Sequence, residues 1–146
     1  MTARAVAVRR AGDWPDSGLR GEVVFDYDRR HRRRMKFMAA DVGEILLDLP
    51  DAVHVRDGDA FELEGGGFIR VRAVPEAVLE VAAPDADTLA RLAWHLGNRH
   101  LAVQFLPGRL RILDDHVIAG MIAQMGGQAE RVMAPFDPEP GAYHHG

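Results

Sequence analysis

The chain contains no cysteine among its 146 residues. This absence excludes a disulfide framework, a thiolate nucleophile and any metal site with sulfur ligands. A metal ion bound by this protein must therefore be held by nitrogen and oxygen donors. Imidazole suits nickel, zinc and copper, whereas carboxylates alone favour harder ions.

Long apolar runs and an excess of positive charge are also missing. No stretch is long enough to cross a bilayer and no secretory leader is visible, so we expect a cytoplasmic protein with no membrane partner. The net charge of -4 argues against general affinity for nucleic acid. The 47% hydrophobic and 27% charged content is typical of a folded protein of one domain or two small ones.

The first 74 residues are predicted to be all-β. Short apolar or alternating stretches, separated by turn residues, recur at the spacing of a small sandwich or barrel. The expected strands are residues 3–9, 21–27, 43–49, 61–64 and 68–73. The glycines between the last two strands form a hairpin loop and not a phosphate cradle, because no helix follows them.

A run of positive charge, Arg29–Lys36, interrupts this region. We interpret it as an exposed strand whose long cationic side chains deter edge-to-edge pairing, with docking of an acidic protein surface as the alternative. Strand alternation would place on one face Tyr27, His31, Arg33, Met35 and Phe37. No interleaved aromatic pattern supports binding of single-stranded nucleic acid.

From residue 75 the pattern changes to strands and helices in the order βαββαβ. The expected elements are strand 77–82, helix 85–96, strand 102–106, strand 109–113, helix 115–125 and strand 128–134. This order predicts a ferredoxin-like antiparallel sheet with both helices on one face. The fold class is thus α+β, with an all-β domain (1–74), a ferredoxin-like domain (75–134) and a flexible C-terminal tail (135–146).

His100 is the first candidate metal ligand. The apolar spacing of residues 85–96 predicts an amphipathic helix, and Gly97 stands where a left-handed C-terminal cap is expected. His100 would then project from a loop beyond a rigid helix end, a common way to place a binding side chain. A surface histidine that hydrogen-bonds a carbonyl remains the alternative. His95, inside the helix, is interpreted as a half-buried packing residue.

Three further histidines are candidates. His116 follows Asp114 and Asp115 at the start of the second helix, whose positive dipole end disfavours a protonated ring and keeps it available as a ligand. Plain capping by the aspartates, with His116 merely exposed, is an equally good interpretation. His144 and His145, near the C-terminus, are either metal collectors or bystanders, and the residues alone leave both open.

Four segments together resemble one known family. Their order matches that in the UreE family of urease accessory nickel chaperones: His95–His100, Pro107–Gly108, Asp115–Val117 and Phe136–Tyr143. Any one segment would be weak evidence, whereas the combination is specific. The C-terminal half resembles the family closely. The N-terminal half resembles it in its strand pattern, its basic strand and its Arg-Asp-Gly-Asp turn.

The resemblance implies a peptide- or partner-binding β domain and a metal-binding domain that forms a homodimer. It implies that His100 meets its symmetry mate across the interface and binds Ni(II), with His116 as a subsidiary ligand in some members. His144 or His145 would complete or extend the site. The protein would be a carrier and not an enzyme. It would deliver nickel to the urease apoprotein complex through an accessory GTPase, and Zn(II) or Cu(II) could occupy the same donors.

One imidazole alone is too few ligands for a metal site. A dimer with a two-fold axis removes this difficulty, since an isologous interface supplies every ligand twice. The sequence departs from some relatives in having Asp114 where they carry a histidine, and in having only two tail histidines; both departures suggest few metal ions per dimer. Two alternatives remain. The chain could be an interaction module that docks a partner through its basic strand, or a hydrolase using His100 and Asp115 around a metal.

Overall fold

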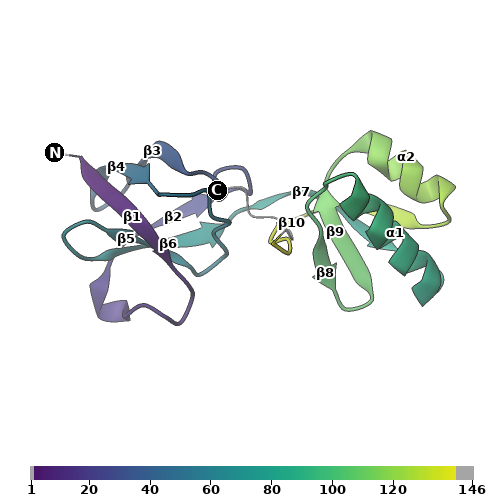
Figure 1. Cartoon of the computed structure of the whole chain (residues 1–146), viewed down its shortest axis with the longest axis horizontal. Helices are drawn as coiled ribbons and strands as arrows, with labels where there is room; N and C mark the ends of the chain where they lie inside the picture. Colours follow the sequence, from purple (N-terminus) through teal and green to yellow (C-terminus); the bar gives the residue numbers. More distant parts are fainter. Residues whose placement is uncertain (1, 141–146) are drawn as a thin grey trace. The chain divides into compact units, whose positions relative to one another are not determined.

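The computed structural model describes residues 2–140. The chain forms two compact units that divide between Val74 and Pro75 (Figure 1). We call them the N-terminal unit and the C-terminal unit. Within residues 2–140, no helix is long and apolar enough to cross a membrane. The cytoplasmic location and the roles assigned to the domains stay predictions.

The N-terminal unit is one curled, six-stranded sheet, as the all-β prediction requires. Its strands are β1 (Ala3–Arg9), β2 (Leu19–Phe25), β3 (Arg34–Ala39), β4 (Gly43–Asp48), β5 (Ala60–Leu63) and β6 (Phe68–Ala73), with the short 3-10 helix η1 (Asp16–Gly18) before β2. The strands lie in the order β2-β6-β5-β1-β4-β3, and the pairs β1/β4 and β2/β6 are parallel. Alternate residues of these strands fill one apolar core that includes Ile45, Phe61 and Ile69.

The basic run does not form the predicted continuous strand. Residues 26–33 are turns and bends, and β3 begins only at Arg34. Arg30 is fully buried. Its guanidinium is satisfied there, because its Nε donates to the Phe25 carbonyl at 3.3 Å and its Nη1 to the Val55 carbonyl at 3.0 Å. Arg32 pairs with Asp28 at 2.5 Å. Much of this positive charge is thus engaged inside the unit, which weakens the interpretation as a docking strand.

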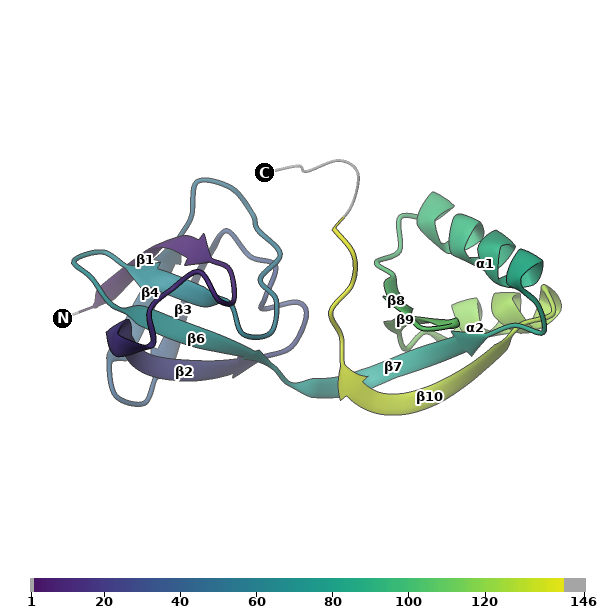
Figure 2. The same cartoon turned by 90° about the horizontal axis from the view of Figure 1, so that it is seen from below.

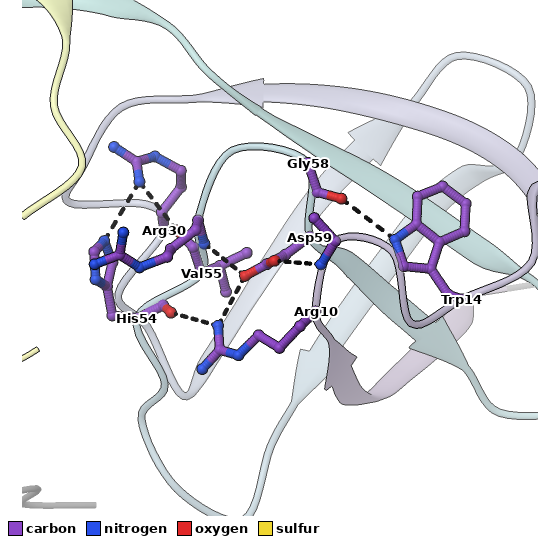
Figure 3. A network of polar contacts seen from close by, with 9 residues as sticks. Arg10, Trp14, Arg30, His54, Val55, Gly58 and Asp59 are labelled. Carbon is purple, nitrogen blue, oxygen red and sulfur yellow. Dashed lines mark hydrogen bonds and ion pairs between the residues drawn. The ribbon is translucent and has the colours of Figure 1, made fainter.

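A buried carboxylate organises the loop between β4 and β5. Asp59 is 2% exposed and accepts hydrogen bonds from the backbone N–H groups of Ala11 and Arg56, each at 2.8 Å. Arg10 Nη1 donates to the same carboxylate at 2.8 Å and to the His54 carbonyl at 3.0 Å (Figure 3). The predicted turn at residues 56–59 is therefore confirmed, and three donors offset the cost of burying its charge.

His54 lies beside this network. Its Nε2 is 3.5 Å from Nη1 of Arg30 (Figure 3). Its ring also packs edge-on against Tyr27, with ring centroids 5.4 Å apart. Burial, followed by the positive charges of Arg30 and Arg56, lowers the pKa of His54 from 6.5 to about 4. The ring is therefore neutral at pH 7, as a nitrogen that faces a guanidinium donor should be.

The C-terminal unit has the predicted βαββαβ order. Its elements are β7 (Pro75–Ala82), α1 (Ala86–Asn98), β8 (Gln104–Leu106), β9 (Arg109–Leu113), α2 (His116–Gln124) and β10 (Gln128–Pro135). The four strands form an antiparallel sheet in the order β10-β7-β9-β8. This is the strand order of the ferredoxin-like split motif, so the predicted fold class is confirmed.

Both helices cover the same face of this sheet. Leu79 and Val81 on β7 pair with Ile112 and Leu110 on β9. These side chains join apolar residues of both helices in one core, with Leu92 and Leu96 from α1, and Ile118 and Ile122 from α2. The opposite face carries both apolar and charged side chains, among them the buried Val78. There Glu80 receives hydrogen bonds from Arg109 and Arg111, and the bond from Arg111 contributes most to holding the pKa of Glu80 below its ordinary value.

The segment after β10 differs from the predicted flexible tail. Figure 2 shows the chain bending sharply at the end of β10 and leaving the direction of the strand. Phe136 is fully buried, and the Glu139 N–H donates to the Val103 carbonyl at 2.9 Å. Residues 135–139 are therefore held by the C-terminal unit, and the prediction of flexibility from residue 135 onward was wrong for them.

Candidate metal centre

His100 stands at the left-handed cap of helix α1. Its N–H donates to the Gly97 carbonyl at 2.9 Å, and the next N–H, that of Leu101, donates to the Leu96 carbonyl at 3.1 Å. This pair of bonds is the Schellman motif, in which the residue carrying the first bond has a positive φ. Leu96 is fully buried and Leu101 packs against the same core, which adds the apolar contact that usually accompanies the motif.

The backbone of His100 is strained relative to an ordinary residue. Its φ is 61°, and within residues 2–140 every other positive φ belongs to a glycine. An L-residue other than glycine in this region costs roughly 1 kcal/mol, although histidine tolerates it better than most. Helix α2 ends in the same motif and has Gly126 at the equivalent position, with a φ of 90°. The imidazole at position 100 is therefore not required by the cap.

The predicted cap at Gly97 was wrong. Gly97 lies inside α1, which continues to Asn98 with Arg99 as its C-cap. The prediction for His95 was also wrong, because its side chain is exposed and packs edge-on against the ring of Trp94, with centroids 5.0 Å apart. The prediction that His100 projects from a rigid helix end is confirmed: the side chain is exposed. None of the hydrogen bonds within residues 2–140 involves its ring, which disfavours the carbonyl-bonded alternative.

His116 is the first residue of α2, and its side chain is exposed. The N-cap is Asp115, whose carboxylate accepts from the N–H groups of Val117 at 2.9 Å and Ile118 at 3.2 Å. Asp114 instead pairs with Arg131 at 2.8 Å. Capping by Asp115 is therefore confirmed, whereas the prediction that Asp114 shares in the cap was wrong. The imidazole of His116 takes no part in the cap. The role of His116 as a metal ligand stays a prediction.

A pocket lies between the segments that carry these two histidines. Its volume is about 300 Å³. It is lined by the residues directly after His100 and directly before His116, together with the end of β9 and one residue of α2: Leu101, Ala102, Ile112, Leu113, Asp114, Asp115 and Ile118. The fold thus brings the loop that follows α1 and the loop that precedes α2 to the same depression on the surface.

One copy of the described chain does not supply a complete metal site. Among residues 2–140, no three side chains of histidine, aspartate or glutamate form a group that could hold an ion. The two remaining predicted ligands, His144 and His145, lie outside the described residues. His100 therefore offers one exposed nitrogen donor, and any tight site needs donors from elsewhere.

Comparison with known proteins identifies the family. Residues 2–74 match the N-terminal domain, and residues 76–146 the C-terminal domain, of the family described as UreE urease accessory protein. The chain belongs to the UreE family. This finding confirms the resemblance stated from the sequence, and the C-terminal family domain contains all four predicted ligands.

Individual UreE proteins are similar over nearly the whole chain. A urease accessory protein UreE from Beijerinckia indica is 45% identical over 140 residues, which cover 96% of this chain and 80% of the relative. The corresponding protein from Rhodobacter capsulatus is 46% identical over 143 residues, 98% of this chain and 88% of the relative. That from Ruegeria pomeroyi is 43% identical over 139 residues, covering 95% and 90%.

Sequence reasoning missed the contacts made after β10. Phe136, Asp137 and Glu139 belong to a segment that the resemblance had already marked, but proline and glycine nearby suggested a mobile end. A large aromatic residue directly after the last strand was the available signal, because such a side chain is rarely left in water. In this UreE protein Phe136 is fully buried.

Proposed function

We propose that this protein is a homodimeric Ni(II) carrier that delivers the ion for assembly of the urease active centre. The observation that carries the proposal is the exposed imidazole of His100, held at a strained helix cap that would accept glycine more readily. Strain of this kind is retained where the side chain has a task. Membership in a urease accessory family supports the binding of nickel for urease as that task.

Dimerisation would complete the site. An isologous interface around His100 brings two identical imidazoles together, so that one exposed donor per chain becomes a pair. Exposed apolar side chains lie near both histidines in the sequence, with Phe105 on β8 56% exposed and Val117, next to His116, 64% exposed. Such side chains are what an interface between two copies would cover.

Two copies of His100 leave coordination positions open, as a carrier requires. A closed cage of four protein ligands holds its ion firmly, whereas an open site can pass it to an acceptor. His116, His144 and His145 are the residues we propose as further donors. The same nitrogen donors accept Zn(II) and Cu(II), so preference for nickel rests on geometry and supply.

The acceptor would be the urease apoprotein complex, reached through the urease accessory GTPase in the cytoplasm. In this account the protein transfers an ion and catalyses no reaction. Nickel is its cargo, bound by neutral imidazole nitrogens and released when the acceptor offers a more complete set of ligands.

Urease activation at limiting nickel tests the proposal. In cells that lack this protein, expression of the His100→Ala variant should give no more urease activity than an empty plasmid, and added nickel should lessen the defect. The matched control is His95→Ala, which removes an exposed histidine from the last turn of α1, the helix that precedes His100, and should restore activity like the unaltered protein. Full activity from His100→Ala would refute the assignment of the site.

A further inference from the structure

Trp94 stands at the middle of the solvent-facing side of helix α1. Figure 2 shows α1 lying over one face of the sheet, so one side of the helix is turned away from the strands. The buried residues of this helix are Leu92 and Leu96, which pack in the core. Successive residues of an α-helix are turned by about 100°, so Trp94 lies almost opposite to both of them. An amphipathic helix normally carries a polar side chain at that position, whereas the side chain here is an indole, 63% exposed.

The fold makes little use of this indole. The other tryptophan, Trp14, is half-buried and donates from its indole N–H to the Gly58 carbonyl at 3.3 Å. The ring of Trp94 does not join the apolar core, and none of the hydrogen bonds within residues 2–140 involves its N–H. Tryptophan is the residue type most enriched among those that dominate binding energy at protein interfaces. We therefore expect a partner to cover Trp94.

Two arginines without an ion pair flank Trp94. Three of the five arginines in the C-terminal unit pair with carboxylates of the same unit: Arg109, Arg111 and Arg131. The other two, Arg91 and Arg99, are exposed and form no ion pair within residues 2–140, although acidic residues outnumber basic ones in this unit. Arg91 precedes Trp94 by three residues and Arg99 is the C-cap of the same helix. This end of α1 is therefore locally basic.

The α1 patch, which we define as Arg91, Trp94 and Arg99, leads directly to His100. A helix rises about 1.5 Å per residue, so Trp94 lies only about 9 Å along the axis from the cap at His100. A protein that takes an ion from His100 must bring its own ligands to about 2 Å from that ion, so its surface must cover the end of α1. An ordinary interface covers about 800 Å² of each partner, a disc roughly 16 Å in radius, which is wide enough to include the patch.

We propose that the α1 patch docks the protein that accepts nickel, with the indole of Trp94 seated in an apolar pocket of that protein and carboxylates at its rim facing Arg91 and Arg99. This inference rests on the proposed function and adds the surface through which the ion is passed on. The carboxylates follow from charge complementarity, because guanidinium groups without an ion pair attract acidic side chains. Two α1 patches packed face to face would bring four such groups together, so a second copy of this chain is the poorer occupant.

The two residue types in the patch contribute differently to binding. Burial of the indole stabilises the complex once it has formed, so it slows dissociation. The guanidinium groups attract an acidic surface before contact, so they speed association, and added salt screens this effect. The proposal therefore predicts one signature for Trp94 and a different one for Arg91.

Binding of the nickel-loaded protein to the purified urease accessory GTPase of the same organism, measured by surface plasmon resonance, tests the inference. Trp94→Ala should raise the Kd at least about tenfold, mainly through faster dissociation, and Trp94→Phe should retain most of the affinity. Arg91→Glu should slow association about five- to tenfold at low salt and remove most of its dependence on NaCl. The matched control is Met133→Ala on β10, which truncates a side chain that is also 63% exposed and should change neither rate. An unchanged Kd in both Trp94→Ala and Arg91→Glu would overturn the inference.

Two measurements without the GTPase separate docking from other roles of Trp94. Calorimetric titration with NiCl₂ should give Trp94→Ala the nickel affinity of the unaltered protein, and native mass spectrometry should give it the same dimer. A monomeric variant would assign the α1 patch to the contact between copies, and a loss of nickel affinity would assign Trp94 to the metal site; either result would overturn the inference. Unaltered protein that binds nickel but not the GTPase would also overturn it, whereas unaltered protein that binds no nickel would refute the proposed function.

Discussion

Replacing His100 by glycine is expected to abolish tight nickel binding and, at the same time, to stabilise the C-terminal unit. The left-handed φ of 61° at this position is strained for histidine and relaxed for glycine. Relief of that strain should raise the free energy of unfolding by about 0.5–1 kcal/mol. Nickel titration, and urea denaturation followed by the fluorescence of Trp94 in a Trp14→Phe background, measure the two effects.

Two matched variants separate the loss of the imidazole from the relief of backbone strain. His100→Ala should also lose nickel binding but gain no stability, because alanine has a Cβ and the same strain. Gly126→Ala introduces a side chain at the equivalent cap of α2, where φ is 90° and no neighbouring atom lies within 4 Å of the added carbon. It should cost about 1 kcal/mol and leave nickel affinity unchanged. A His100→Gly variant that still binds nickel tightly would show that the imidazole is not a ligand.

Acidification is expected to destabilise the N-terminal unit between pH 6.5 and pH 4 through His54. Burial and nearby guanidinium groups lower the pKa of this ring from 6.5 to about 4. The unfolded chain therefore takes up a proton before the folded one does, so stability falls as the pH drops through this window and levels off below it. Allowing for the partial exposure of the ring, the loss is about 2 kcal/mol.

Trp14 reports this transition if it is the only tryptophan. Its indole donates to the Gly58 carbonyl at 3.3 Å and its ring lies 5.7 Å from that of Phe68, both within the N-terminal unit. In a Trp94→Phe background, urea denaturation at several pH values should show the loss, and His54→Gln should remove most of it. The control is His95→Gln in the other unit. An unchanged pH dependence in His54→Gln would contradict the account.

The end of α1 shows where sequence patterns suffice and where they fail. The apolar spacing that predicts the helix is correct, but glycine at position 97 suggested a left-handed cap residue that the structure places three residues later, at His100. The contact between Leu96 and Leu101 decides the matter, because it closes the Schellman motif around His100 and not around Gly97. Burial of Leu96 and packing of the partly buried Leu101 against the same core outweighed the local preference for glycine, and histidine occupies the strained position.

Arg30 and Phe136 illustrate a different limit. The alternating pattern predicted an exposed strand in which every arginine side chain reaches the solvent. In the structure the guanidinium of Arg30 lies in the interior, where it donates to the backbone carbonyls of Phe25 and Val55. The sequence around Phe136 reads as a tail because proline excludes helix and central strand. Its burial depends on a sheet face that only the assembled fold provides. Both errors arise from partners distant along the chain, which local patterns do not encode.

The central claim is that two copies of this chain create one nickel site from their His100 side chains. Native mass spectrometry of the full chain, titrated with Ni(II), tests it most directly. The account predicts a dimer that holds one tightly bound nickel ion, and a His100→Ala variant that no longer retains it. A strictly monomeric protein at saturating nickel, or one tight ion per monomer, would contradict the claim.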